Sequence, residues 1–164
     1  LELEPEYTRG RSHFGVFLYN RGRYEEALEQ FRRASRDTDY DSRAGLFVNL
    51  ARTASQLDRH DEAAEAYKRA MQLRRGSTTA HIGAVTSLID GGRYAEARPL
   101  YRQLTMRIER SPELSHTPAS LLAGIRLARE SGDDRKASGL AEQLRERFPD
   151  SEEYQQYRTM VTDE

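Results

Sequence analysis

A ten-residue pattern occurs twice in this chain, and its recurrence constrains the fold more than any other feature of the sequence. GRYEEALEQF begins at Gly22, and GRYAEARPLY begins at Gly92. The glycine, the tyrosine, the alanine and the closing aromatic residue return, whereas the residues between them vary in size and charge. Selective recurrence of this kind predicts a supersecondary unit that the fold uses more than once.

The alanine of the pattern sets the period of the unit. Ala27, Ala63, Ala97 and Ala137 hold equivalent places in four candidate units and are separated by 36, 34 and 40 residues. Helical periodicity runs through both halves of each unit. A helix–turn–helix unit repeated about every 34 residues builds a stacked array, because one pair of helices cannot bury its apolar face alone. We therefore expect a small alanine where the two helices of a unit cross, since a larger side chain there would push the backbones apart.

The recurring residues resemble those of the tetratricopeptide repeat. In the first repeat of this chain, Gly15 and Ala27 hold the small positions of the tetratricopeptide repeat, and Tyr24 and Phe31 hold aromatic positions. The resemblance weakens toward the end of the chain, where Ile125 stands at a position that is usually small. It implies an all-α fold, a right-handed superhelical solenoid of tetratricopeptide (helix–turn–helix) repeats.

The phase of the pattern divides residues 1–164 into a single repeat array. Residues 1–7 match the tail of a preceding repeat that the chain does not contain, and such a gap would leave an apolar face around Phe14, Phe17 and Leu18 in need of cover. The extra length at 107–118 predicts a longer helix followed by turns at Ser111–Pro112 and Thr117–Pro118. The expected divisions are repeats at 8–43, 44–77, 78–117 and 118–150, with a C-terminal capping helix and tail at 151–164.

Composition and motifs argue against catalysis and against several classes of ligand. The 26 basic and 27 acidic residues nearly cancel, so we expect no broad attraction for nucleic acid or anionic lipid. The absence of cysteine excludes disulfides, thiolate metal sites and cysteine nucleophiles. The four histidines form no HExxH motif, and no P-loop, GxSxG or GxGxxG sequence is present. The sequence predicts a protein that is not an enzyme and that uses no cofactor and no metal.

The remaining candidate for function is a surface that binds another protein. The resemblance implies that the first helix of each repeat lines a concave groove, where Val48, Ile82 and Leu122 share one position and would form an apolar strip flanked by arginines. Such a strip suits an extended or helical peptide with apolar anchors and some acidic groups. The alternative is that some of these side chains pack against adjacent helices. The predicted partner-binding residues are Val16, Tyr19, Asn20, Val48, Arg52, Ser55, Ile82, Thr86, Ile89, Leu122, Arg126 and Arg129.

Two segments resemble a narrower family. HFGVFLYNRGRYEEALEQF at 13–31 and LLAGIRLARESGDDRKASGLAEQLRERFPDSEEYQ at 121–155 are similar to the type IV pilus biogenesis and stability proteins, the pilotins of the PilW/PilF family. GIR-x-AR-x-x-GD and RERFPDSEEY carry most of this likeness, because the general repeat does not require them. The resemblance implies the last four repeats of a lipoprotein on the periplasmic face of the outer membrane, whose lipidated cysteine lies upstream of this chain. Its partner would be the outer-membrane secretin, whose assembly it assists.

The alternative function is a generic cytoplasmic tetratricopeptide-repeat scaffold that binds another peptide or protein. One known type of such scaffold holds the C-termini of chaperones in a carboxylate clamp made of lysine and asparagine. This chain has Val48 with Arg52, and Ile82 with Thr86, at the corresponding positions, which disfavours that clamp. Either function predicts a protein partner and no contact with a membrane through the chain itself.

Overall fold

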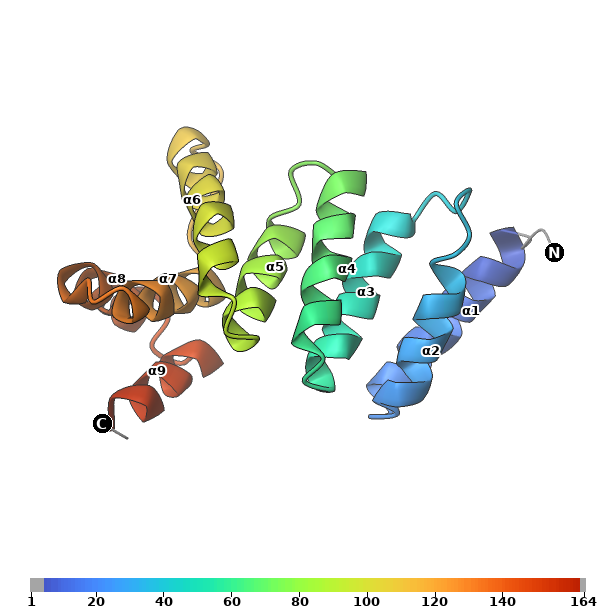
Figure 1. Ribbon diagram of the computed structural model, residues 1–164, viewed down its shortest axis with the longest axis horizontal. Helices are drawn as coiled ribbons and strands as arrows, with labels where there is room; N and C mark the ends of the chain where they lie inside the picture. The colour runs from blue at the N-terminus through green and yellow to red at the C-terminus, as the bar shows by residue number, and fades with distance from the viewer. Residues whose placement is uncertain (1–4, 163–164) are drawn as a thin grey trace. The chain divides into compact units, whose positions relative to one another are not determined.

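The computed structural model describes residues 5–162, and in that range it contains helices joined by turns and loops and no strands. Figure 1, coloured from blue to red along the chain, shows the antiparallel helix pairs α1 with α2, α3 with α4, and α7 with α8. Contacts divide the chain into two compact units, one reaching to Ser87 and the other starting at Leu88. The helices are α1 Pro5–Asn20, α2 Tyr24–Ala34, α3 Arg43–Gln56, α4 His60–Leu73, α5 Thr78–Asp90, α6 Tyr94–Arg110, α7 Pro118–Glu130, α8 Asp134–Arg147 and α9 Glu152–Thr162.

The predicted all-α repeat fold is confirmed. In the first unit α1 packs against α2, α2 against α3 and α3 against α4, and in the second unit α7 pairs with α8. The repeat boundaries stay a prediction, and α1 begins at Pro5, three residues before the expected start of the first repeat. Residues 1–4, assigned to the tail of a preceding repeat, lie outside the described residues.

The small residues of the pattern lie where helices meet. Ala27, Ala63 and Ala97 are completely buried. A methyl group added to Gly15 would come within 2.7 Å of the Phe31 ring, so only glycine permits this approach of α1 to α2. Close packing at fixed intervals therefore explains why these positions recur in the sequence, as overpacking costs about 1–3 kcal/mol.

The turn between the two helices of a repeat uses a left-handed residue. Gly22, Gly92 and Gly132 each have a φ of +72°, a conformation in which glycine meets no steric penalty. The next residue closes each turn, as when the Arg23 N–H donates to the Leu18 carbonyl. The second repeat makes the same turn with Asp58, whose φ is +54°.

Residues 107–118 contain the predicted longer helix and the predicted turn at Ser111–Pro112, where the Leu114 N–H donates to the Ser111 carbonyl, but Thr117–Pro118 begins α7 instead of forming a turn. The helix α6 extends through 17 residues and ends at Arg110. Thr117 then caps α7, because its hydroxyl accepts from the Ser120 N–H while the Ser120 hydroxyl accepts from the Thr117 N–H. Pro118 follows as the first residue of α7, where a proline loses no helical hydrogen bond.

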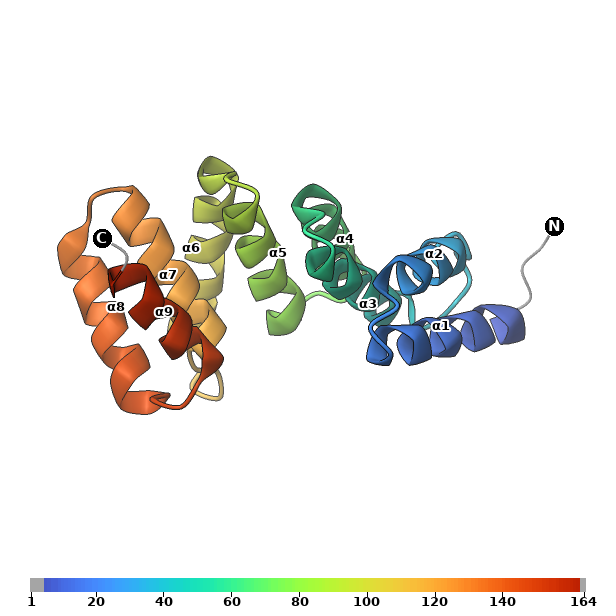
Figure 2. The same ribbon diagram turned by 90° about the horizontal axis from the view of Figure 1, so that it is seen from below.

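The second unit closes with α9, as the sequence predicted. Figure 2 shows this dark red helix lying against α7 and α8, and residues of α9 contact residues of both helices. The Ser151 hydroxyl caps α9 by accepting from the Tyr154 N–H at 3.2 Å. The side chains of Tyr154, Tyr157 and Met160 pack on a buried cluster that consists of Leu121, Leu122, Ile125, Ala141 and Leu144.

The face of α1 that was expected to need cover contains two exposed rings. Phe14 and Phe17 stack with their centroids 6.3 Å apart, and each is 49% exposed. Leu18 is 1% exposed, so its own unit buries it and it does not belong to that face. The prediction that other residues or a neighbouring molecule pack over Phe14 and Phe17 stays a prediction.

Candidate functional site

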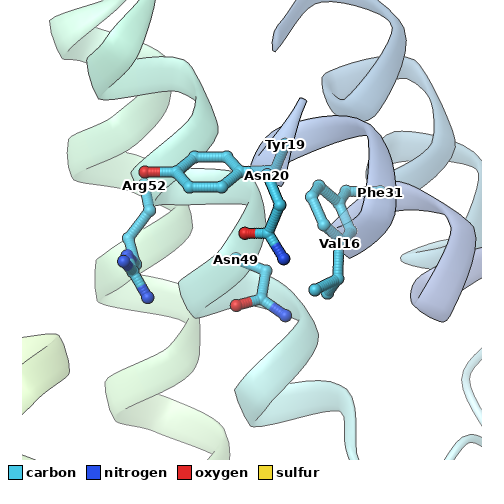
Figure 3. A pocket seen from close by; sticks show the side chains of 6 residues that line it. All are labelled: Val16, Tyr19, Asn20, Phe31, Asn49 and Arg52. Carbon is cyan, nitrogen blue, oxygen red and sulfur yellow. The ribbon is translucent and has the colours of Figure 1, made fainter. Parts of the chain in front are cut away.

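Four of the predicted partner-binding residues line one cavity in the first unit. Val16, Tyr19 and Asn20 come from α1 and Arg52 comes from α3, around a space of about 80 Å³. Tyr19 and Asn20 follow Val16 by three and four residues, so each lies beside Val16 on the surface of α1. Figure 3 shows these side chains together with Phe31 of α2 and Asn49 of α3, which complete the lining.

The sequence interpretation missed Asn49 as a site residue. Asn49 lies three residues before Arg52 in the same helix, and residues at that spacing are neighbours on a helix surface. Helical spacing from Arg52 was therefore the signal that could have identified it. Phe31 was placed at an aromatic position of the repeat, and its side chain, which is 1% exposed, also lines the cavity.

The other predicted residues of the first unit lie outside this cavity. Val48, Ser55, Ile82 and Thr86 are half-buried. The Ser55 hydroxyl donates to the Ala51 carbonyl, and the Thr86 hydroxyl donates to the Ile82 carbonyl at 3.0 Å. These two hydroxyls are thus occupied by their own helices.

Two predicted residues of the second unit do not form part of an accessible surface. Ile89 is 1% exposed and Leu122 is 6% exposed, so their assignment as groove residues is wrong. Leu122 belongs to the cluster on which α9 packs. Both are large aliphatic side chains, and their burial stabilises the fold by about 1.5–3 kcal/mol each.

The two predicted arginines of α7 are half-buried. Arg126 donates to the Asp90 carboxylate at 2.5 Å, which joins the end of α5 to α7 within the second unit. Arg126 is therefore occupied by a contact inside the protein, and Arg129 lies in the last turn of the same helix.

The charge of the cavity comes from Arg52 alone among its six lining residues. The Arg52 guanidinium lies over the Tyr19 ring, 5.6 Å from its centroid, a cation–π contact. Tyr19 in turn packs edge-on against Tyr24 at 5.2 Å. The cavity therefore holds a positive charge that rests on an aromatic ring.

A second aromatic residue lies near this charge. Burial raises the pKa of Tyr67 to about 12, although the positive charge of Arg52 opposes the shift. Tyr67 consequently keeps its proton at neutral pH, and Arg52 has no phenolate to pair with.

Two further kinds of site can be considered among the described residues, a metal centre and a membrane-spanning helix. Within 5–162, no three histidine, aspartate or glutamate side chains gather in a way that would bind a metal ion. In the same range no helix combines the length and the apolar character needed to cross a bilayer.

Comparison with known families identifies the repeat. One model of the tetratricopeptide repeat matches residues 9–76, and a second matches residues 54–117. This chain is a tetratricopeptide-repeat protein. The two matches together cover the cavity between α1 and α3 and all of α4, α5 and α6.

The most informative relatives of this tetratricopeptide-repeat protein belong to type IV pilus systems. The type IV pilus assembly protein PilF of Pseudomonas aeruginosa is 31% identical over 158 residues, which are 96% of this chain and 60% of PilF. The solved structure of Pseudomonas aeruginosa PilF superposes with a TM-score of 0.73 at 30% identity, covering 93% of this chain and 66% of that one.

A third relative supports the fold alone. The crystal structure of PilW, a type IV pilus biogenesis factor, has a TM-score of 0.74 at 22% identity and covers 92% of this chain and 66% of that one. The present chain thus spans less than two thirds of each of these relatives. The resemblance to the PilW/PilF family that the sequence suggested is confirmed.

Proposed function

We propose that this protein is a non-catalytic scaffold in type IV pilus biogenesis, and that it acts as a pilotin for the outer-membrane secretin. The observation that carries the proposal is the 31% identity to PilF along 96% of the chain. Its place of action is the periplasmic face of the outer membrane. The protein partner is the secretin, whose multimers it helps to assemble and place.

The cavity between α1 and α3 supports a role in protein binding. Val16 is 37% exposed, and Asn20 and Arg52 are also exposed, so these three side chains are open to a partner. A surface that combines apolar contact with convergent polar groups is typical of peptide-binding sites. No step of chemical catalysis is required for this role.

Loss of the gene tests the proposal directly. We expect cells that lack it to have fewer secretin multimers in the outer membrane, and we expect the wild-type gene on a plasmid to restore them. Multimers are measured by immunoblot of unboiled outer-membrane fractions. Normal multimers in the deletion strain would contradict the pilotin role and leave the fold unaffected.

Fractionation of the same cells distinguishes the alternative function. A pilotin is expected in the outer-membrane fraction, whereas a generic scaffold for another peptide is expected in the cytoplasm. Recovery of the protein with cytoplasmic markers, together with normal secretin multimers, would favour the alternative.

A further inference from the structure

A separate cavity lies within the second unit, among α6, α7 and the start of α8. Figures 1 and 2 both show α6 beside the α7–α8 pair, and the cavity among these helices measures about 160 Å³. We propose that it binds a phosphate group, held by Arg102, Lys136 and the Tyr101 hydroxyl. The site goes beyond the proposed function, because none of the residues that line it was predicted to bind the protein partner.

The cavity uses a different side of α7 from the predicted groove. Gly124 and Leu127 of α7 line it, three residues apart on one side of the helix. Leu122 and Arg126, which were predicted for the groove, each stand two residues from Gly124, or roughly 200° around the helix. The phosphate site therefore does not overlap the surface on which a bound peptide was expected.

The Tyr101 hydroxyl is a buried polar group in the lining of this cavity. The Tyr101 residue is 5% exposed, and its hydroxyl forms no hydrogen bond with any described residue. The hydroxyl oxygen lies against Gly124, since a methyl group added there would overlap it. Burial raises the pKa of Tyr101 to about 12, so the hydroxyl keeps its proton at neutral pH and remains a donor. A buried donor without an acceptor is unfavourable, and an oxyanion in the cavity would supply the acceptor.

The charge of the lining favours an anion. Arg98 donates to the Glu130 carboxylate, which balances its charge. Arg102 and Lys136 are exposed, and among the described residues neither side chain forms a hydrogen bond or an ion pair. The Asp133 carboxylate also lines the cavity, where it accepts from the Lys136 N–H at 3.1 Å. Two unpaired cations against one carboxylate leave the lining with a net positive charge.

The donors match a tetrahedral oxyanion. Arg102 and Tyr101 belong to α6 and Lys136 belongs to α8, so donors reach the cavity from two helices. The hydroxyls of Thr105 and Ser131 donate to carbonyls of the preceding helical turn and add no further donor. A phosphate accepts at several oxygens in different directions, whereas a carboxylate accepts close to one plane. The volume admits a phosphate group and is below the roughly 300–1,000 Å³ of sites that enclose whole ligands.

Nuclear magnetic resonance titration of the full chain with sodium phosphate tests the inference. Sodium acetate at the same ionic strength is the matched planar anion. We expect phosphate to produce saturable shifts in the backbone N–H signals of Thr105, Ser131 and Lys136, and we expect acetate to bind roughly tenfold more weakly. The absence of saturable shifts, equal binding of the two anions, or shifts confined to residues outside the cavity would overturn the inference.

Two substitutions inside the cavity make the test specific. Arg102→Gln should weaken phosphate binding roughly tenfold, because it removes a charge-assisted hydrogen bond. Tyr101→Phe should weaken it about threefold and should not lower the thermal unfolding temperature, because the hydroxyl that it removes has no partner in the folded protein. Wild-type affinity in both variants would contradict the assigned site.

Arg135→Gln is the matched control for charge. Arg135 precedes Lys136 in α8, is exposed and does not line the cavity. Loss of its charge should change phosphate binding by no more than about twofold, because exposed charges outside the site are screened by water and salt. A loss as large as that of Arg102→Gln would show a general effect of charge and would reject the site.

A phosphate group can come from two sources, a free phosphate and the headgroup of a phospholipid. Flotation of the full chain with vesicles of equal parts phosphatidylcholine and phosphatidylglycerol distinguishes them. Flotation that Arg102→Gln abolishes and Arg135→Gln retains would identify a phospholipid headgroup, and it would correct the expectation that the chain itself does not contact a membrane. Saturable phosphate binding without flotation would identify a free phosphate.

Discussion

The Thr8 hydroxyl donates to the Asp37 carboxylate at 2.6 Å, and both residues are buried. The contact joins α1 to the loop that follows α2. Asp37 also accepts from the Asp39 N–H at 3.0 Å. The loop is therefore held by a carboxylate that accepts hydrogen bonds at both oxygens, which favours its ionised form. The hydrogen bond from Thr8, with smaller help from the backbone N–H groups, lowers the pKa of Asp37 below its usual value.

This pair predicts a specific dependence of stability on pH. Because the folded-state pKa of Asp37 is lowered, its contribution is complete above the unfolded-state pKa and is lost as pH falls through the folded-state value. Thr8→Val should lower the free energy of unfolding at pH 7, and the difference from wild type should shrink in acid. Urea unfolding between pH 7 and pH 3 measures this. A difference that stays constant over that range would contradict the assigned role of Asp37.

Gly83 in α5 is predicted to resist substitution by alanine. A methyl group there would lie 2.5 Å from two carbons of the Tyr67 ring, which is buried. Gly83→Ala should therefore destabilise the first unit by about 1–3 kcal/mol, measured by urea unfolding. Gly45→Ala is the control, because its added methyl group meets no atom within 4 Å. The control should be neutral or stabilising, as alanine favours helix by about 0.5–1 kcal/mol.

Leu122 is predicted to contribute to stability and not to partner binding. It is 6% exposed and lies in the cluster that α9 covers. Leu122→Ala should lower the free energy of unfolding by about 2–5 kcal/mol, as for other buried leucines. Leu73→Ala, at a residue that is 39% exposed, should change it by no more than about 0.5 kcal/mol. Equal effects of the two substitutions would show that α9 does not protect Leu122 in solution.

The cap of α9 is predicted to hold this helix in place. Ser151→Ala removes the acceptor of the Tyr154 N–H and should cost about 1 kcal/mol. None of the residues of α9 is fully buried, so the loss should act on α9 before the rest of its unit. Hydrogen exchange should become faster in α9 and stay unchanged in α3 and α4. Uniform acceleration in all helices would indicate global destabilisation instead.

Residue spacing in the sequence was sufficient to predict the repeats. Ala27, Ala63 and Ala97 recur because close helix crossings admit only small side chains, and all three are buried. Gly22, Gly92 and Gly132 recur because the turn needs a left-handed residue. Each of these requirements falls at a fixed position within the repeat. The same residue types therefore recur at regular intervals in the sequence, and their spacing predicts the repeat.

The candidate site was only partly predictable for the same reason. Spacing grouped Val16, Tyr19, Asn20 and Arg52 as residues of one surface, and these four do line one cavity. It also placed Leu122 on the groove, although α9 and its aromatic side chains bury that residue. The position of α9 depends on contacts between residues far apart in the chain, which periodicity does not record.

The amino-acid sequence by itself determined the helical repeat, the turns and the family, since each follows from side-chain size or backbone conformation within one short segment. Only the tertiary structure decided which side chains stay open to a partner. Arg52 stays exposed and unpaired whereas Arg126 forms an ion pair with Asp90, although both were predicted to lie in the groove. The difference arises because burial and charge pairing depend on the neighbours that packing brings together, and those neighbours lie on other helices.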